Sequence, residues 1–167
     1  MTMAAMCGKN SEGVRRLSGK RLFIYCAGGL GRDVLKMARY INRQQGRWEE
    51  VFFIDDHFTS GEMNNAPVIR FEKYLKQRNN HTDAVYRKQI YQKLKESGCV
   101  FTNIVHPNVY LDEYDFIQDG AIITEGNVLG GNIHIGKCTY VSLACILGHD
   151  VVLEDFVTLS HDVNLSG

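Results

Sequence analysis

The chain has 167 residues, 44% of them hydrophobic, and a formal net charge of zero. This length suits one domain or two small ones, and a balanced charge without a basic stripe argues against nucleic-acid binding. No apolar run reaches the roughly 18 residues of a membrane span. The five cysteines are scattered without a CxxC pair, which argues against a disulfide framework or a zinc site and favours a reducing cytoplasm.

The N-terminal half begins with a leader over residues 1–20, which lacks the apolar run of a secretory signal. Residues 21–27 then predict a strand, residues 28–46 a Gly-rich turn opening an amphipathic helix, and residues 49–56 a second strand. Such a βαβ unit binds ligands beyond the carboxyl ends of its strands. The turn and the carboxylates at residues 55–56 both lie at that end.

Two more helices are predicted, over residues 69–77 and 84–98, the second ending at a glycine as helices often do. We expect no strand between residues 76 and 88, because this stretch is polar. Residues 99–107 predict a strand that leads into the second half of the chain.

The second half carries an aliphatic residue at every sixth position without a slip. This period fits neither an α-helix nor an alternating strand, but it fits a parallel β-helix in which each hexapeptide forms one wall of a prism. A second inward slot, four residues later, holds mostly small or branched residues, with Asp115 and Asn127 as exceptions. Gly130, Gly136 and Gly148 directly follow phased residues, where we expect tight corners. The eleven phased positions are Val105, Leu111, Ile117, Ile123, Leu129, Ile135, Val141, Leu147, Leu153, Leu159 and Leu165.

The glycine turn and the acids beyond the second strand form a candidate binding site. Gly28, Gly29 and Gly31 would let a phosphate or a sugar ring approach the backbone at a helix N-terminus. A plain tight turn is the alternative, because Cys26 stands where a GxGxxG motif has its first glycine. The adjacent Asp55–Asp56 pair could accept hydrogen bonds from a ribose or a base, or could be a solvated pair of loop carboxylates.

The candidate catalytic pair is His149 with Asp150, just after a phased leucine. An imidazole titrates near neutrality, and a neighbouring carboxylate can orient it as a general base; an incidental surface pair is the alternative. His161 and Asp162 repeat the pattern two hexapeptides later, on a different wall, and we interpret them as a decoy. The other histidines and cysteines of this half are expected to be structural: His106 at the first coil, His134 near a corner, Cys138 and Cys145.

Four features together resemble one known family. They are the glycine turn, the strand end Phe53–Asp56, the segment Ile104–Leu111, and hexapeptides carrying Leu147–Asp150. This combination, over residues 21–167, resembles the sugar O-/N-acyltransferases that include bacterial UDP-4-amino-sugar N-acetyltransferases and sialic acid O-acetyltransferases. The resemblance implies a Rossmann-like nucleotide-sugar-binding domain over residues 21–101 and a left-handed parallel β-helix over residues 102–167. It also implies a homotrimer.

The resemblance assigns roles to particular residues. His149 matches the catalytic base and Asp150 the acid beside it. The implied reaction is transfer from acetyl-CoA, without a metal, to a nucleotide-linked amino sugar of surface glycan biosynthesis in the cytoplasm. The residues expected to bind the nucleotide sugar are Gly28, Gly29, Leu30, Asp55 and Asp56, and those expected to contact acetyl-CoA are Thr158 and Gly167.

The sequence departs from the family pattern at several points. Cys26 and Leu30 alter the turn, His161–Asp162 replace a Pro–Gly pair, and the strand expected near residue 82 is missing. The prism spans about three and a half coils, fewer than the family pattern has. These departures suggest a fragment, a deletion variant or lost activity. The sequence therefore leaves open sugar or sialic acid O-acetylation, an inactive nucleotide-sugar-binding module and, more weakly, a purely structural trimer.

Overall fold

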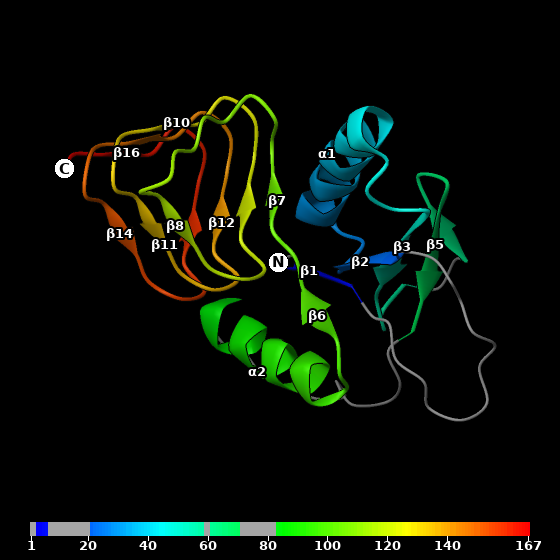
Figure 1. Cartoon of the computed structure of the whole chain (residues 1–167). Coiled ribbons are helices and arrows are strands. Elements are labelled where there is room, and N and C mark those ends of the chain that lie inside the picture. The colour runs from blue at the N-terminus through cyan, green and yellow to red at the C-terminus, as the bar shows by residue number, and fades with distance from the viewer. Residues whose placement is uncertain (1–2, 7–20, 59–60, 71–82) are drawn as a thin grey trace. The chain divides into compact units, whose positions relative to one another are not determined.

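The computed structural model describes residues 3–6, 21–58, 61–70 and 83–167 (Figure 1). The chain divides into two compact units, Met1–Phe101 and Thr102–Gly167. Within the described ranges, no helix is both long and apolar enough to cross a membrane.

The first unit is built on one six-stranded sheet with the strand order β4-β5-β3-β2-β1-β6. Its central strands β2, β3 and β5 run parallel, while β1 is antiparallel to both of its neighbours and β4 is antiparallel to β5. The elements are β1 Met3–Met6, β2 Arg21–Tyr25, α1 Gly29–Gln45, β3 Glu50–Ile54, β4 Glu62–Met63, β5 Ala66–Ile69, α2 Asp83–Glu96 and β6 Val100–Phe101.

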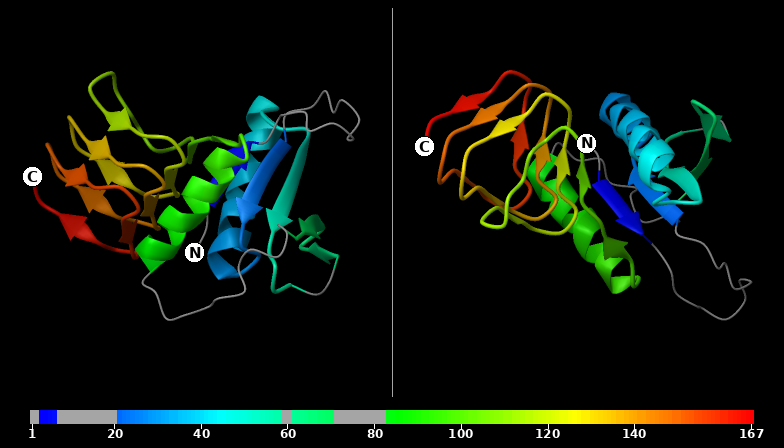
Figure 2. Two further views of the ribbon diagram at one scale, coloured as in Figure 1. Left: turned by 90° about the horizontal axis from the view of Figure 1, so that it is seen from below. Right: turned by 45° about the horizontal axis from the view of Figure 1, so that its top comes forward.

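The predicted βαβ unit is present as β2, α1 and β3. Helix α1 packs beside strand β2, as Figure 2 shows, and buries one apolar face. Gly46 ends the helix in the left-handed region, at φ 57°, and its N–H donates to the carbonyl of Asn42. The buried residues of α1 are Gly31, Val34, Leu35, Met37, Ala38 and Ile41.

Other parts of the first unit differ from the sequence predictions. The expected leader contains β1, which pairs with β2 and β6, and the hairpin β4–β5 was not predicted. The segment 99–107 forms two short strands, β6 and β7, in different sheets. Helix α2 lies where it was predicted, whereas most of the helix predicted at 69–77, and the missing strand near residue 82, fall outside the described residues.

The described cysteines differ in their bonding state. Cys99 is disulfide-bonded, whereas Cys26, Cys138 and Cys145 are free. One bonded cysteine does not make a disulfide framework.

The second unit is a parallel β-helix, as the six-residue period predicted. Its strands are two residues long and stack into three sheets, β7-β9-β12-β15, β8-β11-β14 and β10-β13-β16. Paired residues are one coil apart, as with His134 and Val152. The strands are β7 Ile104–Val105, β8 Phe116–Ile117, β9 Ile122–Ile123, β10 Val128–Leu129, β11 His134–Ile135, β12 Tyr140–Val141, β13 Ile146–Leu147, β14 Val152–Leu153, β15 Thr158–Leu159 and β16 Asn164–Leu165.

Inside the prism, the phased aliphatic residues form one hydrophobic core together with the second inward slot. Asn127, a polar exception in that slot, is buried and accepts a hydrogen bond from the backbone N–H of Cys145 at 2.8 Å. Asp115, the other exception, accepts one from the N–H of Ile133, also at 2.8 Å. Both polar side chains therefore bond a backbone N–H one coil further on, which explains why they are tolerated in this slot.

The corners of the prism correct one prediction. Every sixth residue from Gly120 to Asp162 has a positive φ, so the tight turn lies three residues after each phased position from Ile117 to Leu159. Gly130, Gly136 and Gly148 follow the phased residue directly and lie outside this set. Each instead faces the backbone of the next coil, where an added Cβ would come within 2.5 to 2.7 Å of an amide nitrogen. These glycines are required for close stacking of the coils rather than for an unusual φ.

Candidate active site

His149 and Asp150 form one corner of the prism, directly after β13. Leu147 of that strand is buried in the core, Gly148 stacks on the next coil, and His149 then points outward. Asp150 is the left-handed residue of this corner, with φ 60°. Asp and Asn tolerate this conformation better than most residues, so the corner itself favours a short polar side chain beside the histidine.

The two side chains are hydrogen-bonded. His149 Nδ1 lies 2.9 Å from Asp150 Oδ2, and the other carboxylate oxygen accepts a bond from Asn132 Nδ2 at 3.0 Å. The hydrogen bond with His149, followed by that with Asn132, holds the pKa of Asp150 below its usual value. An ionised carboxylate only accepts, so Nδ1 must carry the proton, and a neutral His149 then has its lone pair on Nε2. This is the arrangement that a general base needs.

The coils on either side leave room for the imidazole. His149 is 75% exposed, and Gly167 is its counterpart one coil on. A Cβ added at Gly167 would lie 2.7 Å from His149 Nδ1, so the ring packs over a residue that has no side chain. Gly131, its counterpart one coil back, has open space around its Cβ position. A glycine column therefore flanks the catalytic candidate.

The second His–Asp pair lies elsewhere, as the period predicted. His161 follows β15, which belongs to a different sheet from β13. Its Nδ1 lies 3.2 Å from the hydroxyl of the buried Ser142, so this imidazole pairs with a hydroxyl where His149 pairs with a carboxylate. The structure thus separates the two histidines into different corners with different partners.

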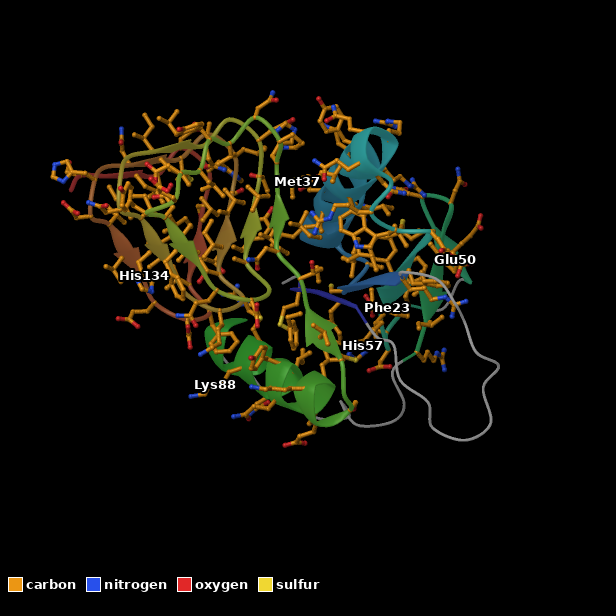
Figure 3. The ribbon with its side chains drawn as sticks, in the orientation of Figure 1. Phe23, Met37, Glu50, His57, Lys88 and His134 are labelled. Atoms are coloured by element: carbon orange, nitrogen blue, oxygen red, sulfur yellow. The ribbon has the colours of Figure 1, made fainter. Side chains whose placement is uncertain are left out.

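The remaining histidines of the prism have structural surroundings. His106 is buried and accepts a bond from the N–H of Asn108. His134, labelled in Figure 3, was expected near a corner, but it lies in β11 on the outer face of a wall. Its ring centroid lies 4.6 Å from that of Phe116. In the described part of the chain, no group of His, Cys, Asp or Glu is arranged to hold a metal ion.

The residues expected to contact acetyl-CoA are not neighbours within one chain. Thr158 is an exposed residue of β15, while Gly167 follows β16 in another sheet. Only Gly167 lies at the His149 corner.

In the first unit, the glycine turn is tightly packed. Cys26 has φ 76°, the left-handed conformation that glycine adopts most easily, which fits its place at the first glycine of the motif. A Cβ on Gly31 would lie 1.9 Å from the carbonyl oxygen of Cys26, so glycine is required there for packing. Gly28 caps α1 without a side-chain hydrogen bond, and the Cβ position of Gly29 faces open space. Leu30 follows in the first turn of the helix and is half-buried.

Asp55 holds this turn in place. Its Oδ2 accepts a bond from the N–H of Ala27 at 2.9 Å, and its Oδ1 accepts one from the N–H of His57 at 2.9 Å. The carboxylate therefore links the turn after β2 to the end of β3, a structural role that the sequence did not predict. Asp56, next along the chain, is half-buried. The structure brings both acids and the glycine turn to the same end of the sheet.

Asn132 is the residue of the site that the sequence analysis missed. It lies one coil before Asp150, bonds that carboxylate, and shares its left-handed backbone, with φ 60°. Three walls of six residues give a coil of 18 residues, which the sequence already indicated. Counting back one coil from Asp150 would therefore have identified Asn132 as its neighbour.

The known proteins that are similar to this chain include a sugar N-acetyltransferase. No family model matches the chain. It is 26% identical over 152 residues to the GDP-perosamine N-acetyltransferase of Escherichia coli O157:H7, covering 86% of this chain and 69% of that protein.

Two solved structures are similar over the same share of the chain. The acetyltransferase domain of PglB from Neisseria gonorrhoeae FA1090, in complex with acetyl coenzyme A, has a TM-score of 0.73 and 25% identity, covering 86% of this chain and 71% of that one. WeeI from Acinetobacter baumannii AYE has a TM-score of 0.72 and 26% identity, covering 86% and 70%.

These likenesses confirm the resemblance read from the sequence: the chain is similar to sugar acetyltransferases of the hexapeptide-repeat kind. They also confirm the acyltransferase class, with acetyl-CoA as the co-substrate of that class.

Proposed function

We propose that this protein transfers the acetyl group of acetyl-CoA to the amine of a nucleotide-linked sugar, with His149 as the general base. The observation that carries the proposal is the hydrogen bond between His149 and Asp150, which directs the lone pair of a neutral imidazole to Nε2. The kind of acceptor is supported by the curated relative, whose name is that of a GDP-perosamine N-acetyltransferase. A role in surface glycan biosynthesis belongs to the same proposal.

The proposed reaction is direct transfer. The acceptor nitrogen attacks the thioester carbon while Nε2 of His149 takes the proton that the nitrogen loses. The C–S bond then breaks, the acetyl group stays on nitrogen as an amide, and the CoA sulfur leaves as a thiolate that takes up a proton. Asp150 stabilises the imidazolium that forms, and Asn132 holds Asp150 in place. Backbone N–H groups would stabilise the oxyanion.

Acetyl-CoA is proposed to bind at the glycine column beside His149. Gly167 lacks a side chain directly over the imidazole, so its backbone N–H can approach the thioester region. Thr158 is the second proposed contact, and it lies on another wall of the same chain. A neighbouring prism could bring the two positions together around one cofactor molecule.

A homotrimer would supply that neighbour. His149 is 75% exposed in a single chain, and water at such a site would compete with the acceptor. The walls that meet beyond this corner carry large apolar residues on their outer faces, namely Ile146 and Val152, which are 44% and 61% exposed. A group of exposed apolar residues is typical of a surface that becomes buried in an assembly.

The first unit is proposed to be a Rossmann-like domain that binds the nucleotide sugar. The start of α1 carries no acidic residue in its first turn, so its unpaired N–H groups are available to a phosphate. Gly28, Gly29 and Leu30 would lie along the sugar diphosphate. Asp55 retains lone pairs for a ribose or base beyond those used by the backbone, and Asp56 follows it.

The handedness of the prism and the location of the protein also belong to this proposal. The prism is proposed to be left-handed. The location is proposed to be the cytoplasm.

The test is CoA release from acetyl-CoA, followed with a thiol reagent, in the presence of a GDP-linked 4-amino sugar. The matched substrate is the same GDP-sugar with a hydroxyl in place of the amine. CoA release with the amino sugar, and not with the hydroxyl sugar, supports N-acetylation. Release with the hydroxyl sugar, and not with the amino sugar, would indicate O-acetylation. Saturable sugar binding without any release of CoA would indicate a binding module. Either of these results would overturn the proposed reaction.

A further inference from the structure

All the cations of helix α1 lie along one stripe. They recur three or four residues apart, and the helix carries one acidic residue, Asp33. Positions at this spacing share one face of a helix, opposite the apolar face that packs on the sheet. The cations are Arg32, Lys36, Arg39 and Arg43.

This stripe lines an open hollow rather than a convex surface. The hollow has a volume of about 470 Å³, and its other lining residues are Asp33, Leu35 and Asn64. Leu35 is buried and forms the floor, while Asn64 comes from the turn between β4 and β5. Four cations against one carboxylate leave a formal charge of +3 around the hollow.

The wall opposite the helix is fixed to it. Arg39, half-buried, donates from Nη2 to the backbone carbonyl of Asn65 at 2.9 Å. Asn64 and Asn65 both have positive φ, at 50° and 57°, as a tight two-residue hairpin turn requires. The hairpin therefore carries a polar side chain to the rim of the hollow, and the guanidinium that anchors it is held before any ligand arrives.

We propose that this hollow is a binding site for a small, multiply charged phosphate anion. A row of cations on an exposed helix is most often a solvated face, but here the row borders a concavity of the size that ligand pockets have. Three guanidinium groups match the oxygens of a diphosphate, because each presents paired N–H donors. No aromatic side chain lines the hollow, so a stacked base is not required of the ligand.

The hollow uses other residues than the proposed nucleotide-sugar site. None of Gly28, Gly29, Leu30, Asp55 and Asp56 lines the hollow. The inference therefore stands on the first unit alone and does not depend on acetyl transfer.

The test is calorimetric titration of the full chain with inorganic pyrophosphate. The variant is Lys36→Gln with Arg43→Gln, two exposed positions that leave the Arg39 anchor in place. The control is Lys88→Gln with Lys95→Gln, which removes the same charge from exposed positions of α2. We expect one site per chain, affinity at least about tenfold lower in the variant than in the control, and weaker binding as salt rises from about 0.01 M to about 0.15 M.

Two results would overturn the inference. Equal affinity in variant and control, or no saturable binding, would mean that the stripe is a solvated helix face. The same proteins are also mixed with vesicles containing an anionic phospholipid. Binding to vesicles that depends on Lys36 and Arg43, without binding of pyrophosphate, would assign the cations to a lipid headgroup and refute a small-ligand site.

Discussion

Replacing Gly136 by alanine should destabilise the β-helix, although glycine-to-alanine changes are usually mild. A Cβ at this position would lie 2.5 Å from the amide nitrogen of Asp155 and 2.5 Å from the carbonyl carbon of Glu154. Ordinary contact begins near 3.4 Å, so the backbone of the next coil must move by 3.4 − 2.5 = 0.9 Å. That backbone cannot move alone, because Asp155 and Phe156 both bond Lys137 across the two coils.

The expected cost follows from these contacts. Overpacking costs about 1–3 kcal/mol, and each strained hydrogen bond across the coils adds about 0.5–1.5 kcal/mol. We expect Gly136→Ala to lower the free energy of unfolding by roughly 2–3 kcal/mol. For a chain of this length that corresponds to a fall in Tm of roughly 4–12 °C.

Gly131→Ala is the matched control. A Cβ at Gly131 would meet nothing within 4 Å, and its φ is not in the left-handed region. This variant should be neutral or more stable by about 0.4–1 kcal/mol, because alanine restricts the unfolded chain. Thermal unfolding followed by circular dichroism at one fixed protein concentration compares the two. Equal Tm values, or a lower Tm for Gly131→Ala, would refute the stacking role assigned to Gly136.

Four further predictions concern the corners of the prism and the glycine turn. Asp150→Asn should lower kcat by roughly 10- to 100-fold, as part of what a positioned base contributes. The pKa of Asp150 is lower in the folded than in the unfolded chain, so its ionised form stabilises the wild type relative to this variant. Acid unfolding curves should show this advantage in full above the unfolded-state pKa. The advantage should be lost as the pH falls through the folded-state pKa. Asn132→Gly keeps the left-handed backbone and removes the amide, so kcat should fall with little change in Tm; an unchanged kcat would argue against a positioning role. Ala144→Gly, at φ 58°, should raise the stability by about 1 kcal/mol in the same thermal assay. Gly31→Ala should unfold the first unit or prevent its expression, whereas Gly29→Ala should express normally.

The β-helix was predictable because its signal is local and repeated. The phased residues identify the inward positions, and three six-residue walls set the coil length that pairs His134 with Val152. The position of the corner was predicted wrongly because a glycine can be required for two different reasons, a positive φ or a close contact with neighbouring backbone. Gly136 is required for close contact with the backbone of the next coil. The positive φ belongs instead to Cys138, a residue type that does not indicate a turn.

The first unit was harder to predict because its sheet joins distant segments. Strand β1 is four residues long, and its partners β2 and β6 begin far along the chain, so no local pattern marks it. The hairpin β4–β5 did have a signal in Asn64–Asn65, since asparagine tolerates the positive φ that such turns need. At the candidate site, the sequence identified His149 and Asp150 but could not give their hydrogen bond or the contribution of Asn132.

The most direct test of the central claim compares His149→Ala with His161→Ala in formation of the N-acetylated nucleotide sugar, measured by mass spectrometry. Both histidines are exposed, and both sit at corners of the same prism. We expect His149→Ala to lose roughly 100- to 10,000-fold in kcat, the range of a general base, and His161→Ala to retain activity close to that of the wild type. Full activity in His149→Ala together with loss in His161→Ala would contradict the assignment of the base.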